Sequence, residues 1–269
     1  MTDLPAVAHG LHVRRLGRGA RQVLAFHCTM AHSGALRGLA QGLGAGVTVT
    51  APDMPSHGRS PDWDGQDSVL DRVIEAGSAL LSEPMDLIGH SFGGVVALHL
   101  AVQRPELVRS LVLFEPVFFA VVKQDQPEVT VADAKGMQPV HDALAVGDPE
   151  TAARVFNALW GAGGTRWRDL AETTRAAMTR GVAILADANS QITQDPHGLL
   201  RPGGLDRVTA PALLLRGAHS PAITGAANTG LARRLPDAVS TIVEGTGHMA
   251  PLTDAARVAD EITRFWSRV

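Results

Sequence analysis

Short apolar runs that favour strands alternate with helical patterns through the first half of the chain, and this alternation constrains the fold more than any other feature. The strand candidates are residues 22–28, 47–51, 85–89 and 110–114. Helical patterns fill the gaps between them at residues 34–43, 68–81 and 95–102. Strands separated by helices predict βαβ units, and therefore an α/β fold with a mostly parallel central sheet flanked by helices.

The alternation stops after residue 116 and returns near residue 208. The stretch between reads mostly as helix, at residues 133–146, 149–160 and 169–188, and is too long to be a structureless loop. Strand patterns then recur at residues 211–215 and 240–243, followed by helical patterns at 225–235 and 254–267. We therefore expect a core formed by residues 1–118 and 208–269, with a helical cap inserted at residues 119–207.

Charge and cysteine content exclude several classes of protein. The formal net charge of −3 gives no electrostatic signature of a nucleic-acid partner. The single cysteine, Cys28, permits neither an intrachain disulfide nor a cysteine-based zinc site. The N-terminus does not resemble a secretory signal, and the longest apolar stretch, near residues 110–122, contains Glu115 and is too short to span a bilayer. We expect a cytoplasmic protein with no membrane partner and leave its oligomeric state open.

A nucleophile motif lies between the third apolar run and the helical pattern that follows it. Residues 89–93 read Gly-His-Ser-Phe-Gly, a G-x-S-x-G pattern in a strand-to-helix context. Such a turn holds the central Ser91 in a strained conformation, with its hydroxyl exposed above the sheet. The N-terminus of the following helix supplies free N–H groups and a partial positive charge, which favour a developing oxyanion.

Four segments together resemble the α/β-hydrolase superfamily over nearly the whole chain. They are residues 26–29 (FHCT), residues 53–60 (DMPSHGRS, with Ser56 in place of a glycine), the strand-to-helix turn at 89–93, which we call the elbow, and Gly247-His248 in EGTGHMAP. The resemblance implies a serine hydrolase that needs no cofactor or metal and acts on a small molecule. In the chain order of this family, the base comes last, and His248 occupies that place. We expect His90 to be a structural neighbour of the elbow and His27 to bond to nearby backbone.

The acidic partner of the histidine departs from the commonest pattern of the family. Ser220 occupies the position where an Asp is often found, and a hydroxyl cannot supply the charge that stabilises an imidazolium. Glu115, at the end of the 110–114 run, is our candidate because some relatives place the acid after the sixth strand. It lies in an apolar context, where a buried carboxylate must be paired. Asp187 and Glu244 remain weaker alternatives.

The resemblance also suggests an oxyanion hole and a substrate pocket. The expected donors are the backbone N–H groups of Phe92 and Thr29. Cap residues could roof an apolar pocket, and we expect it to include Met30, Phe119, Trp160 and Met249. Phe118, Phe156 and Trp167 could also line it, although the aromatic residues could equally form the cap's own core.

The bond that we expect such a site to cleave is a carboxylic ester of a small to medium apolar substrate. Thioesters, lactones and C–C bonds are rivals on the same triad, and a non-catalytic ligand-binding protein is a rival of a different class. The absence of tyrosine argues against an epoxide hydrolase, because no tyrosine pair can hold an epoxide oxygen.

Overall fold

The computed structural model describes residues 6–161 and 165–269, and within them eight strands form one sheet. The strands are β1 (Ala6–Ala8), β2 (Leu11–Gly17), β3 (Arg21–Phe26), β4 (Val47–Pro52), β5 (Met85–His90), β6 (Val108–Phe114), β7 (Ala212–Gly217) and β8 (Ala238–Val243). Their order is β1-β2-β4-β3-β5-β6-β7-β8. Only the pairs β1·β2 and β2·β4 are antiparallel, so the prediction of a mostly parallel sheet is confirmed.

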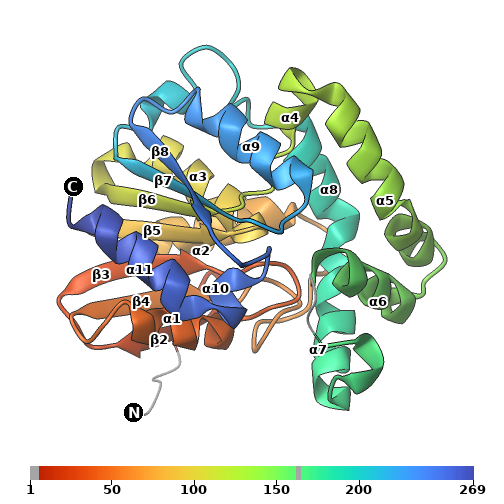
Figure 1. Ribbon diagram of the computed structural model, residues 1–269. Helices are drawn as coiled ribbons and strands as arrows, with labels where there is room; N and C mark the ends of the chain where they lie inside the picture. The colour runs from red at the N-terminus through yellow and green to blue at the C-terminus, as the bar shows by residue number, and fades with distance from the viewer. Residues whose placement is uncertain (1–5, 162–164) are drawn as a thin grey trace.

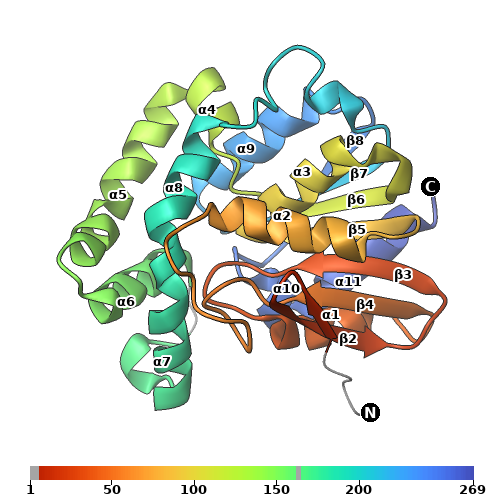
Figure 2. The same ribbon diagram turned by 180° about the vertical axis from the view of Figure 1, so that it is seen from behind.

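Helices cover both faces of the sheet. One face carries α2 (Val69–Leu80), α3 (Phe92–Gln103) and α9 (Ala222–Ala232), and the other carries α1 (Arg37–Gly42), α10 (Ala250–Thr253) and α11 (Ala255–Trp266) (Figures 1 and 2). Successive strand residues serve opposite faces, so Leu87 packs under α3 while Ile88 packs toward α11. This double coverage explains why β5 is buried along its whole length, including its two polar residues, Asp86 and His90.

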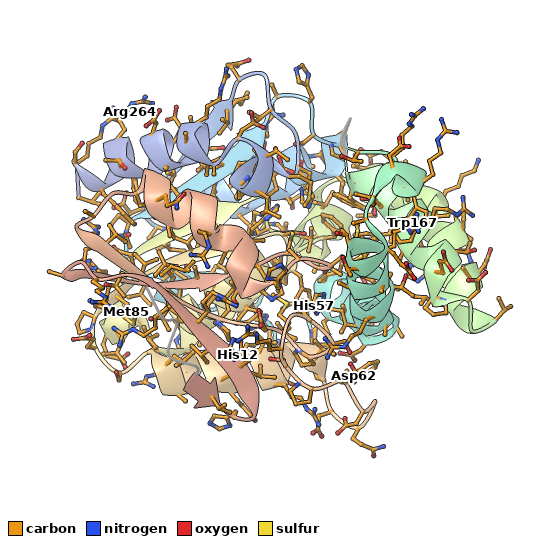
Figure 3. All side chains as sticks on the ribbon, turned by 90° about the horizontal axis from the view of Figure 1, so that it is seen from below. His12, His57, Asp62, Met85, Trp167 and Arg264 are labelled. Carbon is orange, nitrogen blue, oxygen red and sulfur yellow. The ribbon has the colours of Figure 1, made fainter. Side chains whose placement is uncertain are left out.

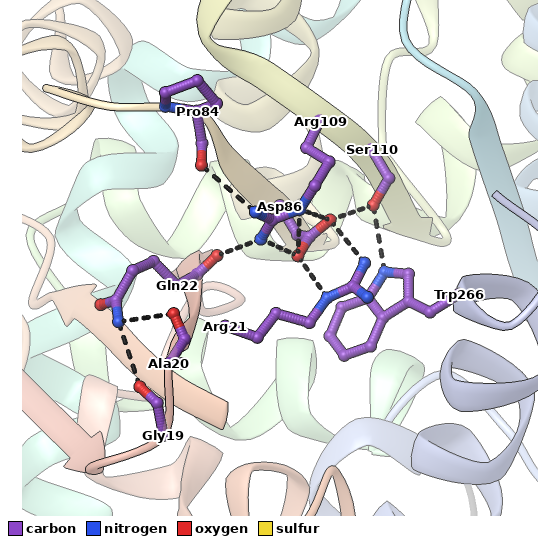
Figure 4. Close-up of polar contacts among 9 residues, drawn as sticks. All are labelled: Gly19, Ala20, Arg21, Gln22, Pro84, Asp86, Arg109, Ser110 and Trp266. Atoms are coloured by element: carbon purple, nitrogen blue, oxygen red, sulfur yellow. Dashed lines mark hydrogen bonds and ion pairs between the residues drawn. The ribbon is translucent and has the colours of Figure 1, made fainter. Parts of the chain in front are cut away.

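A buried ionic cluster links β3, β5 and β6 at the end of the sheet where these parallel strands begin (Figure 4). Asp86 is fully buried and accepts hydrogen bonds from Arg21, Arg109 and Ser110. Arg21 also lies over the ring of Trp266, whose Nε1 donates to the Ser110 hydroxyl. Burial by itself raises the pKa of Asp86, but its hydrogen bonds to the two guanidinium groups and the hydroxyl outweigh this effect and hold the pKa below its usual range.

Five helices follow β6 and lie together beyond the carboxyl ends of the parallel strands (Figure 1). They are α4 (Ala120–Asp125), α5 (Pro127–Ala145), α6 (Pro149–Trp160), α7 (Glu172–Gly181) and α8 (Leu185–Gln194). Val140, Ala153 and Val182 belong to a small hydrophobic cluster of their own. The placement of these helices matches an insertion between β6 and β7.

One element prediction in this region is wrong, because residues 169–188 do not form a single helix. The chain breaks into α7 and α8 around a 3-10 turn at Val182–Ile184. Gly181 stands at the break, packed so closely on the His57 ring that a Cβ would lie 2.7 Å from its Nε2. A side chain at this position would collide with the core loop, so the break lies where the helix packs against the core. Strands β1 and β2 and helix α4 were also not expected.

Two kinds of feature are absent from the described residues. Among them, no helix is long and apolar enough to cross a membrane. The same residues contain no group of three or more His, Cys, Asp or Glu side chains arranged to hold a metal ion.

Candidate active site

Ser91 occupies a strained turn between β5 and α3. Its φ and ψ angles are 57° and −120°, a conformation that L-residues rarely adopt. The neighbouring glycines are required by space, because a Cβ on Gly93 would collide with the carbonyl oxygens of Phe26 and His27. The turn is held by a hydrogen bond from the Ser91 N–H to the Phe114 carbonyl on β6. The hydroxyl of Ser91 has no hydrogen-bond partner among the residues that the structure describes.

Glu115 and His248 form a buried pair beside this turn. The Nδ1 of His248 lies 2.6 Å from Oε2 of Glu115, and the two side chains are 4% and 0% exposed. The other carboxylate oxygen, Oε1, accepts a hydrogen bond from the backbone N–H of Gly217 at 2.6 Å. Glu115 follows β6 directly and adopts a φ of 46°, so the carboxyl ends of β5 and β6 carry two strained residues side by side, Ser91 and Glu115.

The other acidic candidates lie elsewhere. The carboxylate of Asp187 accepts a hydrogen bond from the N–H of Val69 and so caps the start of α2. Glu244 is exposed. The hydroxyl of Ser220 is buried and has no hydrogen-bond partner among the described residues. Of the three carboxylates considered, the structure brings Glu115 alone to His248.

Two further histidines support the site. The Nε2 of His90 lies 2.8 Å from the His248 carbonyl oxygen, which requires Nε2 to carry the proton. Burial, followed by the nearby His248, lowers the pKa of His90 well below its usual range, so it stays neutral. His27 makes contacts with backbone, as expected: its Nδ1 lies 2.8 Å from the Cys28 carbonyl, and its Nε2 accepts from the N–H of Met54.

The loop after β3 brings a free backbone donor toward the elbow. The N–H of Thr29 has no hydrogen-bond acceptor among the described residues, while the next N–H, that of Met30, donates to Nε2 of His57 at 2.8 Å. Met30 takes a positive φ of 64°, whereas Cys28 does not. Burial raises the pKa of the Cys28 thiol to about 12, so this thiol is not a reactive thiolate.

His57 is a residue of this site that the sequence analysis did not single out. Its Nε2 must be unprotonated to accept from Met30, while Nδ1 lies 2.8 Å from the Pro55 carbonyl. Burial lowers the pKa of His57 to about 3, so the ring keeps this role across the physiological pH range. Figure 3 shows it on the loops of the core, beside the inserted helices, with Trp167 farther out. Its place in the 53–60 segment, which resembles a loop of the family, is the sequence feature that could have pointed to His57.

Two cavities meet at Ser91 and share Thr29, Phe156 and Trp160. The larger, of about 230 Å³, also has Phe92 and Phe119 in its wall and extends between α5 and α8. The smaller, of about 200 Å³, is lined by His248, Met30 and Met249. All four residues expected in the pocket therefore lie at one cavity or the other. Trp167 lines neither.

Comparisons with known proteins identify the family of the chain. The sequence model of the Alpha/beta hydrolase family matches residues 22–261. The pimeloyl-[acyl-carrier protein] methyl ester esterase of Aromatoleum aromaticum is 31% identical over 248 residues, which cover 82% of this chain and 90% of that protein. Lipase LipV of Mycobacterium tuberculosis is 41% identical, but over only 111 residues, 39% of this chain and 41% of LipV.

A solved structure shares the fold across the full chain. The bromoperoxidase from Bacillus anthracis superposes with a TM-score of 0.72 and 16% sequence identity, covering 99% of this chain and 100% of that one. At this identity the likeness concerns the fold alone. Together with the match to the family model, these findings show that the chain belongs to the α/β hydrolase family.

Proposed function

We propose that this protein is a serine hydrolase that cleaves carboxylic esters of small molecules through an acyl-enzyme at Ser91. The observation that carries the proposal is the buried pair of His248 and Glu115, joined at 2.6 Å beside the strained Ser91. The names of the relatives point the same way, since a methyl ester esterase and a lipase both act on esters.

In the proposed mechanism, the Ser91 oxygen attacks the ester carbonyl carbon while Nε2 of His248 takes the hydroxyl proton. Nδ1–H of His248 donates to Glu115, which keeps the unprotonated Nε2 toward the serine and stabilises the imidazolium that forms. Collapse of the tetrahedral intermediate breaks the bond to the alcohol oxygen, which takes the proton from His248. A water, deprotonated by His248, then attacks the acyl-enzyme. Collapse of this second tetrahedral intermediate breaks the bond to the Ser91 oxygen, which takes the proton back from His248, and the acid is released.

The oxyanion hole would consist of the N–H groups of Phe92 and Thr29. Phe92 is the first residue of α3, so its N–H has no partner within the helix and lies at the positive end of the helix dipole. The hydrogen bond from Met30 to His57 supports the neighbouring Thr29 donor by fixing the loop. Each such donor contributes about 3–4 kcal/mol where one has been removed.

The two cavities would receive the two halves of the ester. His248 must deliver a proton to the departing alcohol, and it lines the smaller cavity, so we assign the alcohol to that side. Both oxyanion donors line the larger cavity, which we assign to the acyl group. Residues 119–207 would then act as a cap that supplies most of the acyl wall.

Labelling with a fluorophosphonate, mapped by mass spectrometry, tests the proposal. We expect covalent modification at Ser91, loss of both labelling and ester hydrolysis in Ser91→Ala, and neither loss in Ser82→Ala, which changes an exposed serine outside the site. Ester hydrolysis that survives in Ser91→Ala would contradict the mechanism. Absence of both labelling and hydrolysis in the unmodified protein would favour a non-catalytic ligand-binding protein.

A further inference from the structure

The larger cavity is lined by apolar groups from both the core and the inserted helices, and by polar side chains that come mainly from the inserted helices. The core contributes apolar groups around Ser91, including Phe92, Val117 and Ile223. The inserted helices contribute a set of polar side chains, Thr130, Asp133, Gln138 and His141 from α5 together with Asn189 and Thr193 from α8. Together with Ala134 and Met137, which also line the cavity, the α5 residues recur every three or four positions, so this mixed polar and apolar face of the helix is turned toward the cavity.

Asp133 is the unusual member of this set. It is half-buried, and its carboxylate has no hydrogen bond or ion pair among the residues that the structure describes. No lysine or arginine lines the cavity, and His141 is the one other titratable side chain in the lining. Burial raises the pKa of Asp133 to about 6, which leaves the carboxylate mostly ionised at pH 7.5.

A half-buried charge without a partner is unfavourable, because it loses hydration and gains no compensating interaction. This cost is removed when a ligand brings a cationic donor to the carboxylate, and a charge-assisted hydrogen bond of this kind is about twice as strong as a neutral one. The neighbouring hydroxyl and amide groups of Thr130, Asn189 and Thr193 can accept the remaining N–H donors of an ammonium group. An acyl chain ending in a carboxylate would instead meet repulsion.

We propose that Asp133 is a specificity-determining residue that selects esters whose acyl chain carries a protonated amine at its far end. The proposal rests on the proposed function, because it uses the assignment of the acyl group to the larger cavity. The apolar groups of the lining accommodate the methylene chain, and Asp133, together with the polar side chains of α5 and α8, receives the ammonium group.

The test compares methyl esters of unbranched ω-amino acids of increasing chain length with isosteric esters in which a methyl group replaces the ammonium. Monomethyl esters of dicarboxylic acids form a third series. The readout is the ratio of kcat/KM between matched esters, which cancels any general change in the triad. The variants are Asp133→Asn, Asp133→Lys and, as a matched control, Glu128→Gln, an exposed acidic residue on the same helix outside the cavity lining.

We expect the unmodified protein to prefer the ammonium ester at one chain length by about 10- to 100-fold, the range for one hydrogen bond to a charged group. Asp133→Asn should remove most of this preference, Asp133→Lys should turn it toward the carboxylate series, and Glu128→Gln should keep it. Melting temperatures establish that each variant is folded. No purely structural role of Asp133 would invert the preference.

Two results would overturn the inference. One is the absence of any preference for ammonium esters at every chain length, and the other is a preference that Asp133→Asn and Asp133→Lys both leave intact. If neutral esters are hydrolysed and Ser91 is labelled in either case, the proposed function stands and only the assignment of Asp133 fails. If no ester is hydrolysed and Ser91 is not labelled, both proposals fail together.

Discussion

Replacing Glu115 with glutamine tests the unusual acid of this site at nearly constant volume. In the protein both carboxylate oxygens accept hydrogen bonds at 2.6 Å, one from His248 and one from the Gly217 N–H. A glutamine has one acceptor oxygen, and the fixed backbone N–H of Gly217 claims it. The NH2 group then faces Nδ1 of His248 and donates to it, which forces the ring proton onto Nε2.

This tautomer cannot take the Ser91 proton, because its Nε2 is already occupied. An Asp→Asn change in another Ser-His-Asp triad lowers kcat by about 10⁴ for the same reason. We therefore expect Glu115→Gln to lower kcat by about four orders of magnitude, equivalent to about 5 kcal/mol in the activation barrier. The fluorophosphonate labelling rate of Ser91 should fall with it, since both steps need the same base.

The assay measures kcat and KM for a methyl ester, the labelling rate and the melting temperature of each variant. Glu244→Gln is the control, since Glu244 is an exposed acid in the loop that carries His248. It should retain the activity of the unmodified protein. A folded Glu115→Gln variant that keeps more than about a tenth of the activity would refute the reasoning, because a reversed tautomer cannot sustain such a rate.

Two further predictions concern stability. Asp86→Asn weakens the buried cluster with Arg21 and Arg109 and should lower the melting temperature by roughly 6–12 °C. Activity per folded molecule should be retained, since the cluster lies at the end of β5 opposite Ser91. Asp64→Asn, at an exposed pair with Arg72, should change the melting temperature little, and equal effects of the two substitutions would contradict the stabilising role of the buried cluster. Stability should also fall as the pH drops below about 6.5, because burial lowers the pKa of His27 to about 4 and of His57 and His99 to about 3, so the unfolded chain binds more protons there. Calorimetry between pH 7 and pH 5 measures the decline, His99→Gln should make it less steep, and a melting temperature independent of pH would refute the argument.

The local pattern of the sequence was enough to predict the architecture and the turn that holds Ser91. Parallel strands buried on both faces read as continuous apolar runs, so their alternation with helices was visible without any long-range information. The elbow at Ser91 was visible for a similar reason, because the turn requires glycines at fixed positions beside it. Glu115 could be proposed because a carboxylate in an apolar run needs a partner.

What the sequence could not settle is which partner each residue has. Glu115 reaches His248 because β6 and β7 pair in register, with Phe114 opposite Leu215, and because a positive φ turns the chain at Glu115 itself. The break between α7 and α8 lies at the contact of Gly181 with His57, a residue more than a hundred positions earlier. Asp133 gave no signal at all, since a polar residue on a helix looks solvent-exposed until the tertiary structure folds that helix over a cavity. Periodicity therefore determined the elements, whereas the close contacts that create the chemistry depend on side-chain packing between segments far apart in the chain.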